Sequence, residues 1–160
     1  MLMETVTDYK TQIEKNGVIA FVPGGNSMWP MLKHRKQSVI VQKKDGRLKK
    51  FDVGFYQRDN GAFVLHRVMQ VVDGGYVMCG DSQFTLEKVK EENVFGIMTG
   101  FYEGETLVEV TDEKYIKKVK SYYANKTLRK IRLKCFYFRL RVKNKLKRTF
   151  CDKKKGEKND

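Results

Sequence analysis

The chain of 160 residues lacks the long apolar segments that would carry it across a membrane. No run of 18 or more apolar residues occurs in it, so no transmembrane helix is encoded. The N-terminal segment 1–15 contains Glu4, Asp8 and Glu14 and has no apolar core, unlike a secretory signal peptide. These absences predict a cytoplasmic protein.

Cysteine and histidine are scarce, which limits the chemistry that the chain can support. The three cysteines, Cys79, Cys135 and Cys151, are scattered and have neither metal-ligand spacing nor the pattern of a disulfide framework. We expect all three to be reduced thiols. The sequence predicts neither a metal site nor a bound cofactor, and the chain contains only two histidines, His34 and His66.

Glycine and proline are absent from Glu105 to Lys155, and the charge changes in the same region. Residues 1–113 carry 14 Lys and Arg against 16 Asp and Glu, whereas residues 114–160 carry 19 against 3. A series of apolar residues there recurs at the spacing of an amphipathic helix, namely Leu128, Ile131, Cys135, Phe138, Val142, Leu146 and Phe150. We expect one long or two shorter basic helices over 112–151 and a disordered tail over 152–160.

Between Val18 and Val110 the chain contains short segments rich in Val, Ile, Phe and Tyr, which favour strands. Dipeptides such as Asn60-Gly61 separate several of them and favour tight hairpins. The predicted strands are Val18–Val22, Ser38–Gln42, Val53–Gln57, Phe63–Val72, Gly75–Cys79, Val94–Tyr102 and Leu107–Val110. With a short helix over Met3–Lys15, they predict a mainly β domain over 1–111, a small antiparallel β barrel or sandwich.

A serine lies in the glycine-containing turn Gly24–Leu32, close to a proline. Glycine adopts backbone conformations closed to other residues, and Pro30 fixes the direction in which the chain leaves the turn. Ser27 can therefore be exposed as a nucleophile, with neighbouring backbone N–H groups directed at one point. A surface turn between two strands would contain the same residues, so both interpretations stay open.

His66 interrupts an otherwise apolar predicted strand, and two carboxylates follow the next hairpin. It is either a hydrogen-bonded core histidine or a general base for Ser27. Asp81 and Glu87 are each able to orient its imidazole; alternatively Asp81 is a turn residue or braces the loop, and Glu87 is an exposed charge. His34 lies in a basic turn and is expected to be solvated. Serine, histidine and carboxylate in this order are the parts of a serine hydrolase.

Four segments resemble the conserved boxes of the signal peptidase I and LexA-type serine peptidase superfamily. In the order of that family they are Gly25–Leu32, Phe51–Tyr56, Leu65–Val68 and Gly80–Ser82. The resemblance covers roughly residues 18–102 and implies the β fold of the family. Histidine in the third box, where bacterial leader peptidases have lysine, resembles the Ser-His branch formed by the archaeal and endoplasmic-reticulum signal peptidases.

The resemblance implies a serine endopeptidase that cleaves leader or signal peptides bound in extended form. Ser27 would be the nucleophile and His66 the general base. Asp81 matches the aspartate of the Gly-Asp box, and Glu87 falls where the eukaryotic branch has the acid that orients the histidine. The resemblance does not decide between these two carboxylates.

The chain departs from the family at three points, of which one is the basic C-terminal helical segment, since it is not part of the core fold of the family. Gly25 stands where many members have a serine that binds the oxyanion, so we expect N–H groups within Gly25, Asn26 and Ser27 to form the oxyanion hole. The N-terminal membrane anchor that is usual in the family has no counterpart here. The basic segment 114–150 offers another route to a membrane, because it resembles a helix that lies on an anionic lipid surface.

Other functions remain open. A LexA-like self-cleaving regulator normally carries a DNA-binding helix-turn-helix before the protease domain, and only about 17 residues precede the first predicted strand. A non-catalytic binding module would keep the fold and hold a partner with the basic helix. That helix would alternatively pack on the β domain with its charges in water. Nucleic acid is less favoured as a partner because no base-recognition motif is visible.

Overall fold

The structure, a computed structural model, describes the backbone of residues 9–156 and the side chains of residues 9–145. The chain divides into two compact units, Met1–Val119 and Lys120–Asp160. The boundary between these units lies within the helix α2 (Glu113–Ala124). The first turns of α2 belong to the β unit, where the Tyr115 ring lies 5.6 Å from that of Phe101.

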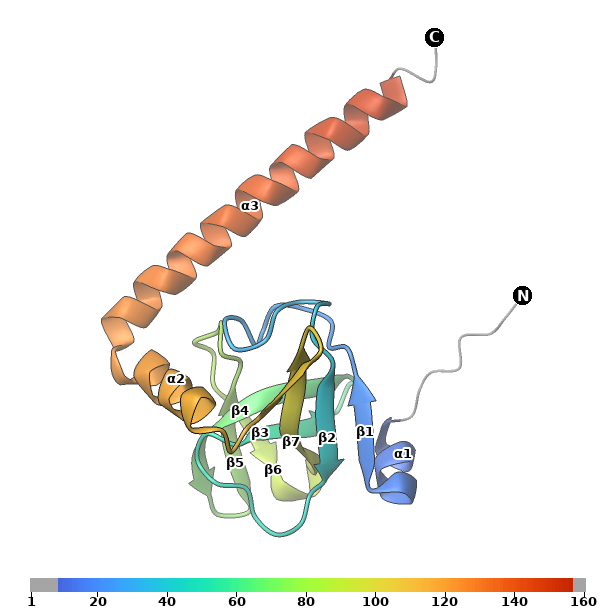
Figure 1. Ribbon diagram of the computed structural model, residues 1–160, viewed down its shortest axis with the longest axis vertical. Helices are drawn as coiled ribbons and strands as arrows, with labels where there is room; N and C mark the ends of the chain where they lie inside the picture. Colours follow the sequence, from blue (N-terminus) through green and yellow to red (C-terminus); the bar gives the residue numbers. More distant parts are fainter. Residues whose placement is uncertain (1–8, 157–160) are drawn as a thin grey trace, which may run out of the picture. The chain divides into compact units, whose positions relative to one another are not determined.

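The first unit is an antiparallel sheet preceded by the short helix α1 (Tyr9–Asn16). The strand order is β1-β2-β7-β3-β4-β5-β6, and β8 pairs with β7. In Figure 1, β3 and β4 lie across the upright β1, β2 and β7, so the sheet is strongly coiled. The strands are β1 (Val18–Phe21), β2 (Val39–Lys43), β3 (Val53–Gln57), β4 (Phe63–Val72), β5 (Gly75–Cys79), β6 (Glu87–Lys90), β7 (Val94–Glu103) and β8 (Thr106–Glu109).

The predicted strands agree with this sheet. β3, β4 and β5 match the prediction residue for residue, and the ends of β1, β2, β7 and β8 differ by one residue. The mainly antiparallel β architecture with a short N-terminal helix and C-terminal helices is thus confirmed. No pairing between β1 and β6 closes the sheet within residues 9–156. The part of the predicted N-terminal helix before Tyr9 lies outside the described residues.

One strand, β6, is missing from the sequence prediction. It consists of Glu87, two lysines and Val89, of which only Val89 is buried, and Glu and Lys are depleted in strands. β6 forms because its backbone pairs with β5, with Glu87 opposite Met78. This pairing fixes the position of the Glu87 carboxylate relative to β3 and β4.

The centre of the sheet gives the site a rigid support. β3 lies between β7 and β4, and its residues from Val53 to Tyr56 are all buried. A core cluster packs against these strands and consists of Leu48, Tyr56, Val68, Tyr76, Met78, Val89 and Val94. The side chains of β3 and β4 that reach beyond this core are therefore held by buried neighbours, as precise positioning requires.

The basic C-terminal region forms two helices, α2 and α3 (Lys126–Gly156). Asn125 separates them, and its Oδ1 accepts a hydrogen bond of 2.9 Å from the backbone N–H of Leu128, as an N-cap residue does. Since neither glycine nor proline occurs between Glu105 and Lys155, nothing interrupts α3, which continues over residues 152–156, where the sequence predicts disorder. Residues 157–160 lie outside the described part. No helix between residues 9 and 156 has the length and apolarity needed to cross a membrane.

Candidate functional site

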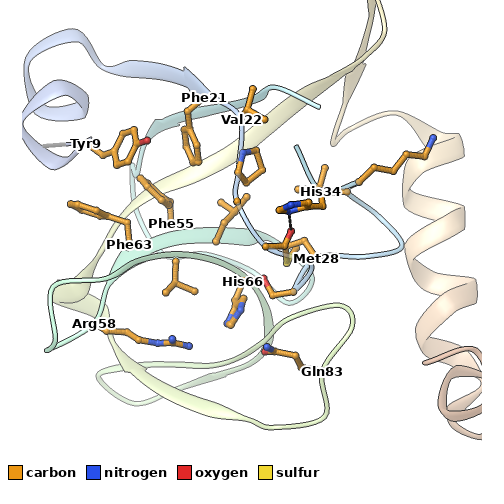
Figure 2. Close-up of a pocket in the computed structure, with 18 residues that line it drawn as sticks. Tyr9, Phe21, Val22, Met28, His34, Phe55, Arg58, Phe63, His66 and Gln83 are labelled. Atoms are coloured by element: carbon orange, nitrogen blue, oxygen red, sulfur yellow. Dashed lines mark hydrogen bonds between the residues drawn. The ribbon is translucent and has the colours of Figure 1, made fainter. Parts of the chain in front are cut away.

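A cleft of about 310 Å³ in the first unit contains both Ser27 and His66 in its lining. One wall is the end of β1 and the turn that follows it, and the other includes residues 63–66 of β4. Ser27 is half-buried, whereas His66 is 3% exposed. Figure 2 shows the aromatic side chains of Tyr9, Phe21, Phe55 and Phe63 gathered at one end of the cleft. The polar side chains of His66 and Gln83 lie at the other end.

Hydrogen bonds to the backbone carbonyl groups of residues 25 and 26 hold the turn around Ser27. The Gly25 oxygen accepts a hydrogen bond of 2.9 Å from His34 Nδ1, and the Asn26 oxygen accepts one of 3.1 Å from the Trp29 N–H. His34 is thus exposed, as expected, but also anchors the turn (Figure 2). The backbone N–H groups of residues 25–27 have no acceptor among the described residues. Such a turn leaves N–H donors available to an anionic oxygen in the cleft.

The loop after β5 fastens the Ser27 turn from the other side. The Ser82 N–H donates to the Ser27 oxygen at 2.8 Å, and Ser82 Oγ donates to the Asn26 oxygen at 2.8 Å. At Gly80, a Cβ atom would lie only 2.7 Å from the Ser27 oxygen. The close approach of the two loops therefore requires glycine at position 80.

His66 is oriented by a chain of hydrogen bonds through Tyr56 to Glu87. The Tyr56 hydroxyl donates to Glu87 Oε2 at 2.8 Å, and its oxygen lies 3.1 Å from His66 Nδ1. Because the hydroxyl hydrogen points to Glu87, Nδ1 of His66 must carry the hydrogen that it shares with Tyr56. This assignment leaves Nε2 of the neutral ring as a hydrogen-bond acceptor, the state that a general base needs.

The electrostatic environment keeps His66 neutral and Tyr56 protonated. Burial lowers the pKa of His66 to about 4, against the opposing effect of the Glu87 charge. Burial, aided by the hydrogen bond to Glu87, raises the pKa of Tyr56 well above its usual range. Arg58 donates to both Glu87 oxygens, at 2.8 and 2.7 Å, and lowers the pKa of Glu87. Glu87 is therefore an anion at neutral pH.

Asp81 serves a different partner from His66. Its two oxygens accept hydrogen bonds from Arg67 Nε and Nη2 at 2.7 and 2.8 Å, and both side chains are at most 1% exposed. Arg67 also donates to the Phe51 carbonyl and the Tyr115 hydroxyl. The Asp81–Arg67 ion pair thus ties the loop after β5 to β4 and α2, which corresponds to the bracing role open to Asp81 from the sequence.

The structure brings some of the predicted site residues together and separates others. Ser27 and His66 line one cleft, although no hydrogen bond joins them within residues 9–156. Such bonds are often long in the absence of substrate. Glu87 Oε2 lies 3.9 Å from His66 Nδ1 with Tyr56 between them. Of the two carboxylates, Glu87 is the one placed to orient His66.

Sequence reasoning missed two residues of this arrangement, Tyr56 and Arg58. Tyr56 lies in an apolar strand, where a tyrosine looks like any core residue. The available signal is the alternation of side chains along a strand: Gly54, Tyr56 and Arg58 are two positions apart and so lie on the same face of the sheet. Gly54 pairs with His66 in the adjacent strand β4. No cluster of three or more His, Cys, Asp or Glu side chains suited to a metal ion occurs in the described region.

No match was found when the chain was compared with protein-family models, with curated proteins and with solved structures. The residues of the cleft and their geometry are therefore the basis for assigning a function. That geometry offers a hydroxyl, a neutral imidazole with a free acceptor nitrogen, and the unpaired backbone N–H groups of Gly25 and Ser27 around one cavity. Asn26, which the sequence also places in the oxyanion hole, is not among the residues that line this cleft.

Proposed function

We propose that the protein is a serine endopeptidase of the signal-peptidase type, which hydrolyses a peptide bond in leader or signal peptides. The observation that carries the proposal is that Ser27 and His66, distant in the sequence, line one cleft, and that Tyr56 and Glu87, which are outside the lining of this cleft, hold the imidazole in the base form. The family resemblance of the sequence boxes supports the same activity. A small β barrel of the signal-peptidase and LexA type is the fold we infer for it.

An extended peptide fits the two walls of the cleft. β1 is the edge strand at one end of the sheet and pairs only with β2 among the described strands. β5 pairs with β4 only from Arg67 onward, so residues 63–66 have one edge without a partner strand in the described region. A substrate in extended conformation would bond to these edges through its main chain. The aromatic end of the cleft would receive an apolar side chain of the substrate.

The reaction proceeds through an acyl-enzyme. Ser27 Oγ attacks the scissile carbonyl carbon while His66 Nε2 takes the hydroxyl proton, and the imidazolium that forms is stabilised by Glu87 through Tyr56. The C–N bond then breaks as His66 returns the proton to the leaving amine. Water adds to the acyl group, passing a proton to His66, and release of the Oγ–C bond restores Ser27.

The developing oxyanion is stabilised by backbone donors of the turn. The N–H groups of Gly25, Asn26 and Ser27 are free of internal acceptors in the described structure, and each donor directed at an oxyanion contributes roughly 3–4 kcal/mol to transition-state binding. The bonds from His34 and Ser82 to the carbonyls of this turn hold its peptide groups in place. No side-chain hydroxyl at position 25 is then needed.

A serine-directed covalent probe tests this proposal. The full chain is treated with a peptidyl phosphonate selected from peptides that the wild type cleaves in a library, and the modified residue is located by mass spectrometry. We expect a single adduct on Ser27, none in Ser27→Ala, and cleavage in trans of the library peptides. Cleavage of the chain itself alone would favour a self-cleaving regulator. Absence of both labelling and cleavage would indicate a non-catalytic binding module and contradict the proposal.

Tyr56→Phe tests whether the phenol positions the base. The substitution keeps the ring and removes the hydroxyl, leaving the Nδ1–H of His66 buried without an acceptor. That loss costs about 1–3 kcal/mol, so we expect kcat/KM to fall about 10- to 100-fold. In the wild type, kcat/KM should stay level as the pH is lowered to about 5 and then decrease as His66 protonates with its pKa of about 4.

The pH profile separates this positioning role from a structural one. Because the acidic limb reports protonation of His66 in the free enzyme, Tyr56→Phe should shift its midpoint, whereas a merely loosened fold would scale the profile without moving it. Phe63→Leu is the matched control for the acidic limb: Phe63 lies at the proposed substrate end of the same cleft, outside the hydrogen-bond chain of His66, so this variant should change KM and leave the midpoint of the limb unshifted. Wild-type kinetics and an unshifted limb in Tyr56→Phe would exclude the relay.

A further inference from the structure

The helix α3 carries a row of exposed apolar side chains that the proposed hydrolysis does not use. Phe138 is 68% exposed and Ile131 53%, although both are large apolar residues. They lie on one side of the helix with three further exposed residues at intervals of three or four, which together we call the apolar stripe: Leu128, Ile131, Cys135, Phe138 and Val142. An apolar row of this kind in water indicates a surface that binds something.

Basic residues border the apolar stripe on both sides. By helical geometry Arg132 and Arg139 flank one side of it, and Lys134 and Lys145 the other. Between Lys126 and Lys145 the described part of α3 contains no acidic residue. The charge of this face is therefore uniformly positive, and its apolar row lies between two rows of long cationic side chains.

We propose that this face of α3 binds an anionic lipid bilayer, lying parallel to its surface. The apolar stripe would enter the boundary between headgroups and acyl chains, while the flanking arginines and lysines extend to the lipid phosphates. The complementary charge of the two surfaces favours this partner. Nucleic acid would use the positive charge but would leave the aliphatic members of the stripe in water, so lipid accounts for both features of the face.

The surface differs from the opposite side of the same helix. Leu133 is buried and Phe136 and Leu140 are half-buried, so those apolar residues already have protein neighbours. Arg129 belongs to that side too, and its guanidinium stacks on Tyr122 and Tyr123 at 5.5 and 4.7 Å from the ring centroids. The stripe is thus the apolar side of α3 that remains accessible.

Vesicle co-sedimentation of the full chain tests the proposal. We expect binding to phosphatidylcholine vesicles that contain phosphatidylglycerol, weak binding to phosphatidylcholine alone, and a decrease at high salt. Arg132→Gln with Arg139→Gln should lower the binding constant about 25-fold, at roughly fivefold per charge. Lys49→Gln with Lys50→Gln removes the same net charge from exposed positions in the β unit and is the matched control; it should bind nearly as the wild type does.

Substitutions within the helix test the role of the stripe. Phe138→Ser should weaken vesicle binding about tenfold, because the variant loses the favourable transfer of the phenyl ring from water into the bilayer. Tyr137→Ser, at the neighbouring position off the stripe, should have little effect. Far-ultraviolet circular dichroism verifies that each variant keeps its helices. As a second readout, a tryptophan in Phe138→Trp should shift its emission to the blue on anionic vesicles, and one in Tyr137→Trp should not.

Three results would overturn the proposal. They are equal binding to neutral and anionic vesicles, vesicle binding of Phe138→Ser equal to that of the wild type, and preference for a duplex RNA or DNA that is insensitive to Phe138→Ser. The lipid surface does not depend on the hydrolytic chemistry, because Ser27→Ala should bind vesicles as the wild type does. Failure of either proposal therefore leaves the other to be judged by its own assay.

Discussion

Replacing His66 by alanine is expected to reduce kcat/KM for peptide cleavage by about 10⁴- to 10⁶-fold, the range found when one member of a serine–base pair is removed. The reason is that Ser27 then has no acceptor for its proton during attack. Ser27→Ala should cost about as much. The double variant should be no slower than either single variant, since the two side chains act as one unit. Single-turnover kinetics with the best library peptide measures all three.

His34→Ala is the matched control for this experiment. His34 lines the same cleft and lies nearer to Ser27 in the sequence, but it acts through the Gly25 carbonyl and has no bond to the reacting hydroxyl. Loss of one exposed hydrogen bond to the turn should lower kcat/KM by about tenfold. The assignment of His66 as the sole base would be contradicted if His34→Ala were as slow as His66→Ala. It would also be contradicted if the losses of Ser27→Ala and His66→Ala multiplied in the variant that combines them.

Asp81→Asn should lower the free energy of unfolding by about 3–5 kcal/mol, because it leaves the buried Arg67 cation without its counter-ion. Both side chains are almost completely buried, and the Asp81 oxygens accept two of the guanidinium hydrogen bonds. The amide of asparagine would point N–H donors at other donors. Urea denaturation at neutral pH measures the loss.

A double-mutant cycle shows whether the loss comes from the ion pair. Arg67→Met with Asp81→Asn should be more stable than the sum of the single losses predicts, by about 2–3 kcal/mol, because the unpaired cation is gone. Glu87→Gln is the control carboxylate, since its partner Arg58 is 40% exposed and such pairs contribute about 1 kcal/mol or less. Strictly additive losses at positions 67 and 81 would contradict the ion-pair explanation.

The variants Asp81→Asn and Glu87→Gln also test which of the two carboxylates orients His66, a choice that the sequence does not decide. Measured at a temperature where Asp81→Asn remains folded, its activity should stay within about tenfold of the wild type, because Asp81 acts through the loop. Glu87→Gln should show the reverse behaviour, with nearly unchanged stability and a larger loss of kcat/KM. Unfolding free energy and kcat/KM should therefore distinguish the role of Asp81 from that of Glu87.

The sequence predicts most of the sheet because its strands have strong local signals. β3, β4 and β5 combine β-branched and aromatic residues with glycine-containing turns, and their predicted ends are correct. β6 has no such signal, since two lysines and a glutamate form it only by pairing with β5. The division within α2 also depends on tertiary contacts, because the burial of Tyr115 comes from Phe101 and Arg67.

The candidate site shows the same division between local and long-range information. Ser27 and His66 stand out because their residue types are unusual in a glycine turn and in an apolar strand. Tyr56 does not stand out, since its hydroxyl acquires a role only when β3 lies beside both β4 and the Glu87 carboxylate. Likewise, the pairing of Asp81 with Arg67 follows from the β4–β5 register, in which Arg67 lies opposite Cys79, two residues before Asp81.

The bond from Ser82 to the Ser27 carbonyl joins residues 55 positions apart. The geometry of the candidate site therefore depends on folding of the chain as far as the loop after β5. Until β5 and β6 have assembled, the turn lacks its clamp and the imidazole lacks its acid, so no partial version of the centre exists. A chain truncated before β6 would therefore lack the proposed activity, because it has neither the Ser82 bonds to the Ser27 turn in their assembled place nor the Glu87 carboxylate.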